Sequence, residues 1–181
     1  MRDLSLHVLD LLENSIRAGA SVIEITVAQD PAAGTLRIAV EDDGPGIRVP
    51  VEVATDPFYT TKSGKKTGLG LSLFRGAAER AGGRLTVGRS RLGGAAIEAT
   101  MELDNVDRSP LGDLAGAVSS IVCTDPEVDL RCTLSVGDRS CRVCVSELAD
   151  GDAPRGLRGL AVARRVSEQI KRALGDLAMR E

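Results

Sequence analysis

A loop rich in lysine, hydroxyl groups and glycine occupies residues 55–71, with the sequence TDPFYTTKSGKKTGLGL. Three of the four lysines in the chain, Lys62, Lys65 and Lys66, lie in this loop, and nearly all other positive charge is arginine. Glycine lets backbone N–H groups point inward, hydroxyls donate hydrogen bonds, and ammonium groups add charge, so this composition suits a polyanion. The sequence therefore predicts a phosphate-binding loop whose ligand is a nucleoside triphosphate.

A second set of polar side chains lies on the helix that the apolar spacing predicts over residues 3–18. His7, Asp10, Asn14 and Arg17 share one narrow arc of that helix, opposite most of its apolar residues. One interpretation is the solvated face of an amphipathic helix. In the other, the Asn14 amide oxygen binds Mg²⁺, Asp10 orients or deprotonates a water molecule, and Arg17 reaches a phosphate.

A third motif, EDDGPGI at residues 41–47, has the spacing Asp42-x-Gly44-x-Gly46. A carboxylate at the end of a strand can accept a hydrogen bond from the exocyclic amine of adenine, and glycines beside it let the backbone approach the base. A plain turn is the alternative, because Asp, Gly and Pro are common turn residues.

The run Thr67-Gly68-Leu69-Gly70 closes the lysine-rich loop and opens the next predicted helix. It lacks the third glycine and the preceding strand of a dinucleotide-binding fingerprint, and no Lys-Ser/Thr pair closes it as in a Walker loop. A solvated basic loop is the alternative to a phosphate-binding turn.

Taken in order, these motifs resemble those of the GHKL ATPases, the superfamily of gyrase, heat-shock chaperone, histidine kinase and mismatch-repair ATPases. The order is a helix with asparagine, a strand pair, Asp-x-Gly-x-Gly, a basic lid and Gly-x-Gly opening a helix. The resemblance covers about residues 1–103. The runs DPFYTTK and GLGLSLFRGAAERAGG resemble histidine kinase catalytic domains most, whereas LENSIRAGAS resembles the mismatch-repair type.

This resemblance implies an α/β two-layer sandwich with a mixed sheet covered by helices on one face, and it implies ATP and Mg²⁺ as ligands. It assigns Mg²⁺ to Asn14, adenine to Asp42 and a phosphate contact to Arg17. The other nucleotide-binding residues that it implies are Gly44, Gly46 and Ile47 near the base, Lys62, Lys65 and Lys66 in the lid, and Thr67, Gly68, Leu69 and Gly70 in the phosphate-binding turn.

The candidate base departs from the family pattern. ATP-hydrolysing members carry glutamate four positions before the asparagine, where this chain has the shorter Asp10. Glu13 points about 100° away around the helix and is a poorer candidate. Asp10 is therefore the candidate catalytic residue, and hydrolysis is an expectation to be tested.

The single histidine bears on the kinase interpretation. A histidine kinase needs a phosphoacceptor histidine on a helical hairpin, but His7 lies on the ATP-binding helix, where we expect a capping or supporting role. The acceptor is then expected on another chain, as in anti-sigma-factor serine kinases. A slow ATPase or a kinase acting in trans is one hypothesis, and a nucleotide-gated regulatory module is the alternative.

The opening run LSLHVLDLLENSIRAGAS also resembles small GHKL proteins encoded beside iron-only hydrogenase and related electron-transfer subunits. A subunit of a redox complex is therefore a second candidate partner, beside a phosphoacceptor protein.

Composition limits the other classes. The chain has 181 residues, 43% hydrophobic and 2% aromatic, so we expect an aliphatic core. The net charge of −3 argues against nucleic-acid binding. No apolar run is long enough to span a membrane and no signal peptide is evident, so a cytoplasmic protein is expected.

The elements that must position these residues follow from the apolar pattern. We predict an ATP-binding domain over residues 1–103, a linker over 104–110 and a small αββα segment over 111–181 that could serve as an interaction module. The first part is predicted to contain helices at 3–18 and 70–81 and strands at 21–28, 35–41, 84–89 and 95–102. The second is predicted to contain helices at 111–122 and 155–178 and strands at 128–136 and 140–147.

All four cysteines lie in that second segment. The spacing Cys141-x-x-Cys144 is compatible with zinc or an iron–sulfur cluster, together with Cys132. A hairpin turning at residues 137–138 would, however, place Cys132 and Cys141 on one face and Cys144 on the other. We therefore expect buried free thiols, with a metal or cluster as the alternative.

Overall fold

The computed structural model describes residues 3–47, 69–148 and 158–180. Its helices and strands, in chain order, are α1 (Leu4–Arg17), β1 (Val22–Asp30), β2 (Thr35–Asp42), α3 (Leu69–Arg80), β3 (Arg84–Arg89), β4 (Ala95–Glu102), α4 (Leu114–Thr124), β5 (Asp129–Val136), β6 (Arg139–Cys144), α5 (Val145–Leu148) and α6 (Arg158–Leu177).

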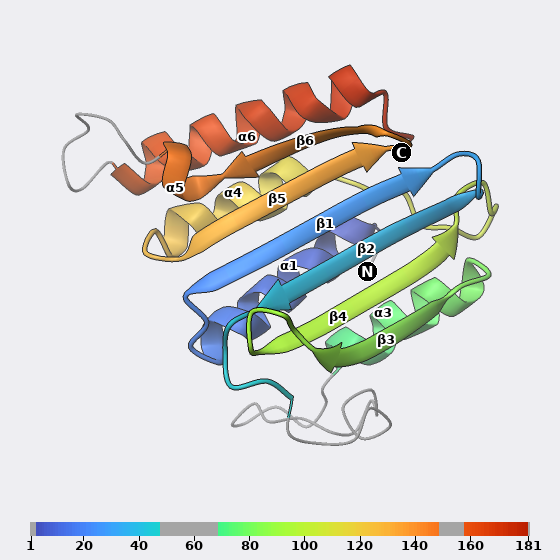
Figure 1. Ribbon diagram of the computed structural model, residues 1–181, viewed down its shortest axis with the longest axis horizontal. Coiled ribbons are helices and arrows are strands. Elements are labelled where there is room, and N and C mark those ends of the chain that lie inside the picture. Colours follow the sequence, from blue (N-terminus) through green and yellow to red (C-terminus); the bar gives the residue numbers. More distant parts are fainter. Residues whose placement is uncertain (1–2, 48–68, 149–157, 181) are drawn as a thin grey trace.

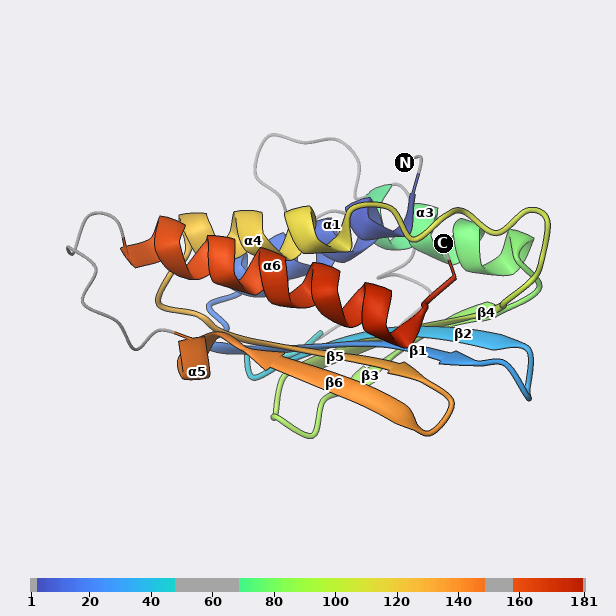
Figure 2. The same ribbon diagram turned by 90° about the horizontal axis from the view of Figure 1, so that it is seen from above.

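The strands form one six-stranded sheet in the order β3-β4-β2-β1-β5-β6 (Figure 1). All neighbouring strands are antiparallel except β1 and β5, which are parallel, so the sheet is mixed. Helices α1, α3, α4 and α6 all lie on one face of the sheet, and the opposite face carries none of them (Figure 2). The predicted fold class, a mixed sheet covered by helices on one face, is confirmed.

The core lies between that helical layer and the covered face of the sheet. On α1 the buried apolar residues Leu4, Val8, Leu11 and Leu12 recur at helical spacing, as the amphipathic pattern predicts. On the strands, alternate residues are buried: along β4, buried and half-buried residues alternate from Ala95 to Met101. Burying each large aliphatic side chain stabilises the fold by about 1.5–3 kcal/mol, so this layer holds α1 firmly in place.

The C-terminal segment continues the same sheet. Strand β5 pairs with β1 along its whole length, from Val22↔Asp129 to Gln29↔Val136. At the end of the predicted linker, the backbone N–H groups of Leu4 and Ser5 donate to the carbonyls of Pro110 and Leu111, at 2.9 and 2.8 Å. The two segments therefore share a sheet and a core, while the division of the chain at residues 104–110 stays a prediction.

One predicted element is partly wrong. The strand expected over 140–147 ends at Cys144, and its last residues belong to the helical turn α5. The Asp129 carboxylate accepts a hydrogen bond at 3.3 Å from the Ser146 backbone N–H, which stabilises the start of this turn. Because this contact comes from Asp129 on a neighbouring strand, it could not be predicted from the alternation of apolar and polar residues over 140–147.

Within residues 3–47, 69–148 and 158–180, no helix has both the length and the apolar character needed to cross a membrane.

Candidate functional site

Three of the predicted site residues are joined by hydrogen bonds along α1. The Asn14 side-chain N–H donates to Asp10 Oδ2 at 3.2 Å, and the Arg17 guanidinium donates to Asn14 Oδ1 at 2.6 Å. These are i,i+4 and i,i+3 pairs, which are neighbours on a helix surface. Asp10 and Asn14 are half-buried and Arg17 is exposed, so the row runs from the protein interior to solvent.

An acceptor on one side and a donor on the other fix the orientation of the Asn14 amide. Its nitrogen faces the Asp10 carboxylate, and its oxygen faces the guanidinium of Arg17. Arg17 also donates from Nε to the Glu13 carbonyl at 3.1 Å. A cation at the Asn14 oxygen would have to replace the Arg17 guanidinium there, and the side chain of Arg17 is exposed.

Gly70, at the start of α3, approaches Asp10 closely. A Cβ at position 70 would lie 1.7 Å from Asp10 Oδ2. Because any side chain there would occupy the space of the carboxylate, glycine is required for Asp10 to keep its position. The predicted base and the end of the predicted phosphate-binding turn are therefore brought together.

His7 is buried beneath this row rather than solvated. Its side chain is 3% exposed and stacks on Phe74 of α3, with ring centroids 4.9 Å apart and an interplanar angle of 17°. Burial lowers the pKa of His7 from 6.5 to about 4, and the nearby Asp10 carboxylate only partly opposes this. The interpretation of the arc as a solvated face is wrong at His7, because α3 covers it. His7 is also not the helix cap, since Asp3 accepts from the Leu6 N–H at 3.1 Å.

Asp42 lies at the end of β2 with 4% of its surface exposed. Its Oδ1 accepts hydrogen bonds from the backbone N–H groups of Gly44 and Ala95, each at 3.0 Å. Its Oδ2 accepts one hydrogen bond, at 2.7 Å, from the Ser15 hydroxyl. A carboxylate oxygen can accept two, so among the described residues Oδ2 retains capacity for a further donor such as an exocyclic amine.

The glycines around Asp42 allow close approach of the backbone. A Cβ on Gly44 would lie 3.2 Å from Asp42 Oδ1, and one on Gly94 would lie 2.1 Å from the same atom. Gly46 has φ of +74°, which favours glycine, and packs beside the Gly94 carbonyl. Within EDDGPGI, Glu41 and Asp42 end β2, and the bend at residues 43–45 places backbone around the buried carboxylate. Ile47, the last residue of the motif, is half-buried against the core.

Ser15 joins the two halves of the site and is not among the residues predicted from the sequence. It follows Asn14 on α1 and is 4% exposed, and its hydroxyl holds the carboxylate of Asp42 on β2. A signal was present: Ser15 continues the buried positions Leu4, Val8 and Leu11 at helical spacing, where a polar residue needs a partner.

The rest of the predicted lid and phosphate-binding turn lies outside the described residues. These are Lys62, Lys65, Lys66, Thr67 and Gly68. Leu69 is the first residue of α3.

The cysteines divide between the faces of the sheet as predicted. Cys132 pairs with Val143 and Cys141 pairs with Leu134, on the helix-covered side, whereas Cys144 pairs with Arg131 on the other. All four cysteines of the chain are free thiols, but only Cys132 and Cys144 are buried, so the expected burial is wrong for the exposed Cys123 and the half-buried Cys141. Burial raises the pKa of Cys132 to about 12. Among the described residues, no three His, Cys, Asp or Glu side chains are grouped to hold a metal ion.

Comparison with known proteins assigns the family. Residues 2–105 match the family described as histidine kinase-, DNA gyrase B-, and HSP90-like ATPase. The chain belongs to this family. It contains a histidine kinase-like ATPase domain, and Asp10, Asn14, Asp42 and Gly70 all lie within the matched residues.

Individual relatives are similar over part of the chain. Sensor protein kinase CarS of Pseudomonas aeruginosa is 35% identical over 102 residues, which are 55% of this chain and 22% of the kinase. The ATP binding domain of PrrB from Mycobacterium tuberculosis is 26% identical, over 54% of this chain and 64% of that domain, with a TM-score of 0.41. This chain thus spans about a fifth of the length of the curated kinase.

A further solved structure is similar in fold across most of the chain. The N-terminal domain of a DNA repair protein aligns with 90% of this histidine kinase-like ATPase and 57% of its own chain, with a TM-score of 0.53 and 11% identity. The similarity extends beyond residues 2–105 and includes most of the C-terminal segment.

Proposed function

We propose that this histidine kinase-like ATPase domain binds ATP·Mg²⁺ between α1, the end of β2 and the start of α3, and transfers the γ-phosphoryl group to water or to a partner protein. The observation that supports this most directly is the 2.7 Å hydrogen bond from Ser15 to the buried Asp42. This bond fixes the Asp42 carboxylate, which is proposed to bind adenine, relative to the helix that carries Asp10, Asn14 and Arg17.

At the base end, the buried carboxylate of Asp42 accepts a hydrogen bond from the exocyclic amine of adenine. Gly44 and Gly46 have no side chain that would block the adenine ring, and Ile47 offers an apolar contact. At the phosphate end, Lys62, Lys65 and Lys66 with Thr67, Gly68, Leu69 and Gly70 hold the phosphates with ammonium, hydroxyl and N–H groups.

The Asn14 amide oxygen is the proposed ligand of Mg²⁺, whose charge would offset that of the phosphates. Arg17, which donates a hydrogen bond to this oxygen in the structure, would then contact a phosphate oxygen instead. Such an exchange suits Arg17, since its side chain is 46% exposed.

Asp10 is the proposed base. Its carboxylate, held by Asn14 and pressed against Gly70, orients a water molecule and takes its proton as the water oxygen bonds to the γ-phosphorus and ADP leaves. In a kinase acting in trans, a side chain of the partner replaces water as the nucleophile.

A nucleotide-gated regulatory module without significant turnover is the second candidate function, with a redox-complex subunit as partner and the cytoplasm as location. It is favoured by the short Asp10, whose Oδ2 already accepts a hydrogen bond from Asn14. It is also favoured by the contacts of α3 with α1 at Gly70 and at His7, because these would transmit closure of the lid to the helical layer.

Asp42→Asn tests the proposed adenine-binding role of Asp42. The amide keeps the size of the carboxylate and can still bond Ser15, Gly44 and Ala95, but it presents a donor to the donor of adenine. We expect ATP affinity to fall about 100-fold in isothermal titration calorimetry, with little change in stability. An unchanged affinity would show that Asp42 does not read the base.

Asp10→Asn, assayed with labelled ATP, tests whether Asp10 acts as the general base. We expect phosphate release, or transfer to an added partner, to fall about 100-fold or more while ATP affinity stays within a few fold. If the wild-type protein binds ATP but neither releases nor transfers phosphate, the regulatory module replaces the enzyme. Capture of partners with and without ATP then becomes the deciding measurement.

A further inference from the structure

The turn between β3 and β4, residues 90–94, lies against Asp42, the residue proposed to bind adenine. The Gly94 N–H donates to the Asp42 carbonyl at 3.0 Å, and the next residue, Ala95, donates to the Asp42 carboxylate. Gly94 also packs beside Gly46. The position of this turn therefore affects both the carboxylate and the glycine that lie beside the base.

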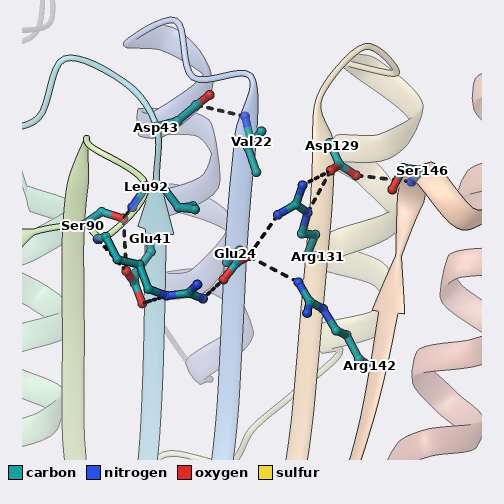
Figure 3. Close-up of polar contacts among 11 residues, drawn as sticks. Val22, Glu24, Glu41, Asp43, Ser90, Leu92, Asp129, Arg131, Arg142 and Ser146 are labelled. Atoms are coloured by element: carbon teal, nitrogen blue, oxygen red, sulfur yellow. Dashed lines mark hydrogen bonds and ion pairs between the residues drawn. The ribbon is translucent and has the colours of Figure 1, made fainter.

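The same turn is held from the opposite face of the sheet. Glu41 lies next to Asp42 but points to the face without helices, because side chains alternate along β2. Its Oε2 accepts from the Ser90 hydroxyl at 3.1 Å and from the Arg91 N–H at 3.4 Å (Figure 3). The Arg91 guanidinium forms ion pairs with Glu41 and with Glu24 of β1.

Glu24 is the centre of this group of charges. Only 10% of its side chain is exposed, and it pairs with Arg91, with Arg131 of β5 at 3.2 Å and with Arg142 of β6 at 3.3 Å (Figure 3). A carboxylate so little exposed interacts with its partners more strongly than one in solvent. Arg131 and Arg142 hold Glu24 from β5 and β6, so Glu24 is a fixed anchor for the more exposed Arg91.

We propose that Arg91 is a positioning residue for the base pocket: by bridging Glu24 and Glu41, it holds the turn at residues 90–94 against Asp42 and so sets ATP affinity and the preference for adenine. It acts from the far side of the sheet and touches no part of the nucleotide. The inference rests on the proposed function, because it assumes that Asp42 reads the base.

Binding of ATP and GTP by Arg91→Ala, measured by calorimetry, tests the proposal. We expect ATP affinity to fall about tenfold and GTP affinity to change little, so that the ratio between the two narrows. For Arg91→Lys, the ratio of ATP to GTP affinity should lie between that of Arg91→Ala and that of the wild type. An ammonium group can pair with Glu24 or Glu41 but cannot bridge them as a guanidinium does.

Arg37→Ala is the matched control. Arg37 lies on the same face of the sheet and pairs with Glu98 at 2.7 Å, joining β2 to β4 away from the turn. It should leave the ratio of ATP to GTP affinity unchanged. An unchanged ratio of ATP to GTP affinity in Arg91→Ala, or an equal decrease of this ratio in Arg37→Ala, would overturn the inference. ATP binding by the wild type would still uphold the proposed function. Failure of the wild type to bind ATP would overturn both.

Discussion

Burial of His7 should make the stability of this protein depend on pH in a particular window. The folded pKa of about 4 lies below the ordinary 6.5, so the folded state disfavours the proton. The stabilising contribution of neutral His7 is complete above pH 6.5 and is lost as pH falls toward 4, because the unfolded chain takes up a proton there first. Between pH 7 and pH 5 this loss amounts to about 2 kcal/mol.

His7→Leu checks this expectation, since leucine stays apolar in the same site and does not titrate. Urea denaturation at pH 7 and pH 5 gives the decrease in the free energy of unfolding for each protein. The decrease should be about 2 kcal/mol smaller in the variant. Carboxylates are common to both proteins and cancel in the difference, so equal decreases would mean that His7 is not held neutral by the fold.

How far the sequence predicts a residue's place depends on where its partners come from. Asp42 and Gly44 lie within one short motif, and the hydrogen bond between them could be expected from it. Burial of His7 and the role of Ser15 depend on Phe74 and Asp42, which are distant in the sequence. The helical period alone places His7 with Asp10 and Asn14 and says nothing of what covers it.

At the level of elements, local periodicity predicts the helices and strands of the sheet well, because each buries a regular stripe or face. The sheet order could not be read in the same way. The parallel pairing of β1 with β5 joins segments about a hundred residues apart, and several strands of similar composition could have taken that place. The short α5 likewise depends on Asp129 of another strand.

The contact between α3 and α1 leads to an expectation for Gly70→Ala. The new methyl group would take the space of the Asp10 carboxylate, which is the end of a side chain and can rotate away at little cost in stability. We expect the free energy of unfolding to change by less than about 1 kcal/mol, while phosphate release falls about tenfold or more because Asp10 leaves Asn14.

Gly76→Ala is the control for that substitution, in the same helix. A Cβ at position 76 would lie 3.4 Å from the Arg80 guanidinium and meet nothing closer, so alanine fits there. It should raise helix stability by up to about 1 kcal/mol and leave turnover unchanged. Similar losses of turnover in both variants would show that rigidity of α3, rather than the position of Asp10, limits the reaction.

At the level of the whole molecule, the shared sheet predicts how the chain unfolds. Without the C-terminal segment, β1 would present its unpaired edge from Val22 to Gln29, and the core would lose Leu114, Val118, Leu130 and Leu134, each contributing about 2 kcal/mol. We therefore expect one calorimetric transition for the full chain. A fragment of residues 1–110 should show no cooperative transition and should bind a hydrophobic dye, since apolar surface is exposed. Two transitions in the full chain, or a fragment that unfolds cooperatively and binds ATP as the full chain does, would instead support an independent ATP-binding domain ending before residues 104–110.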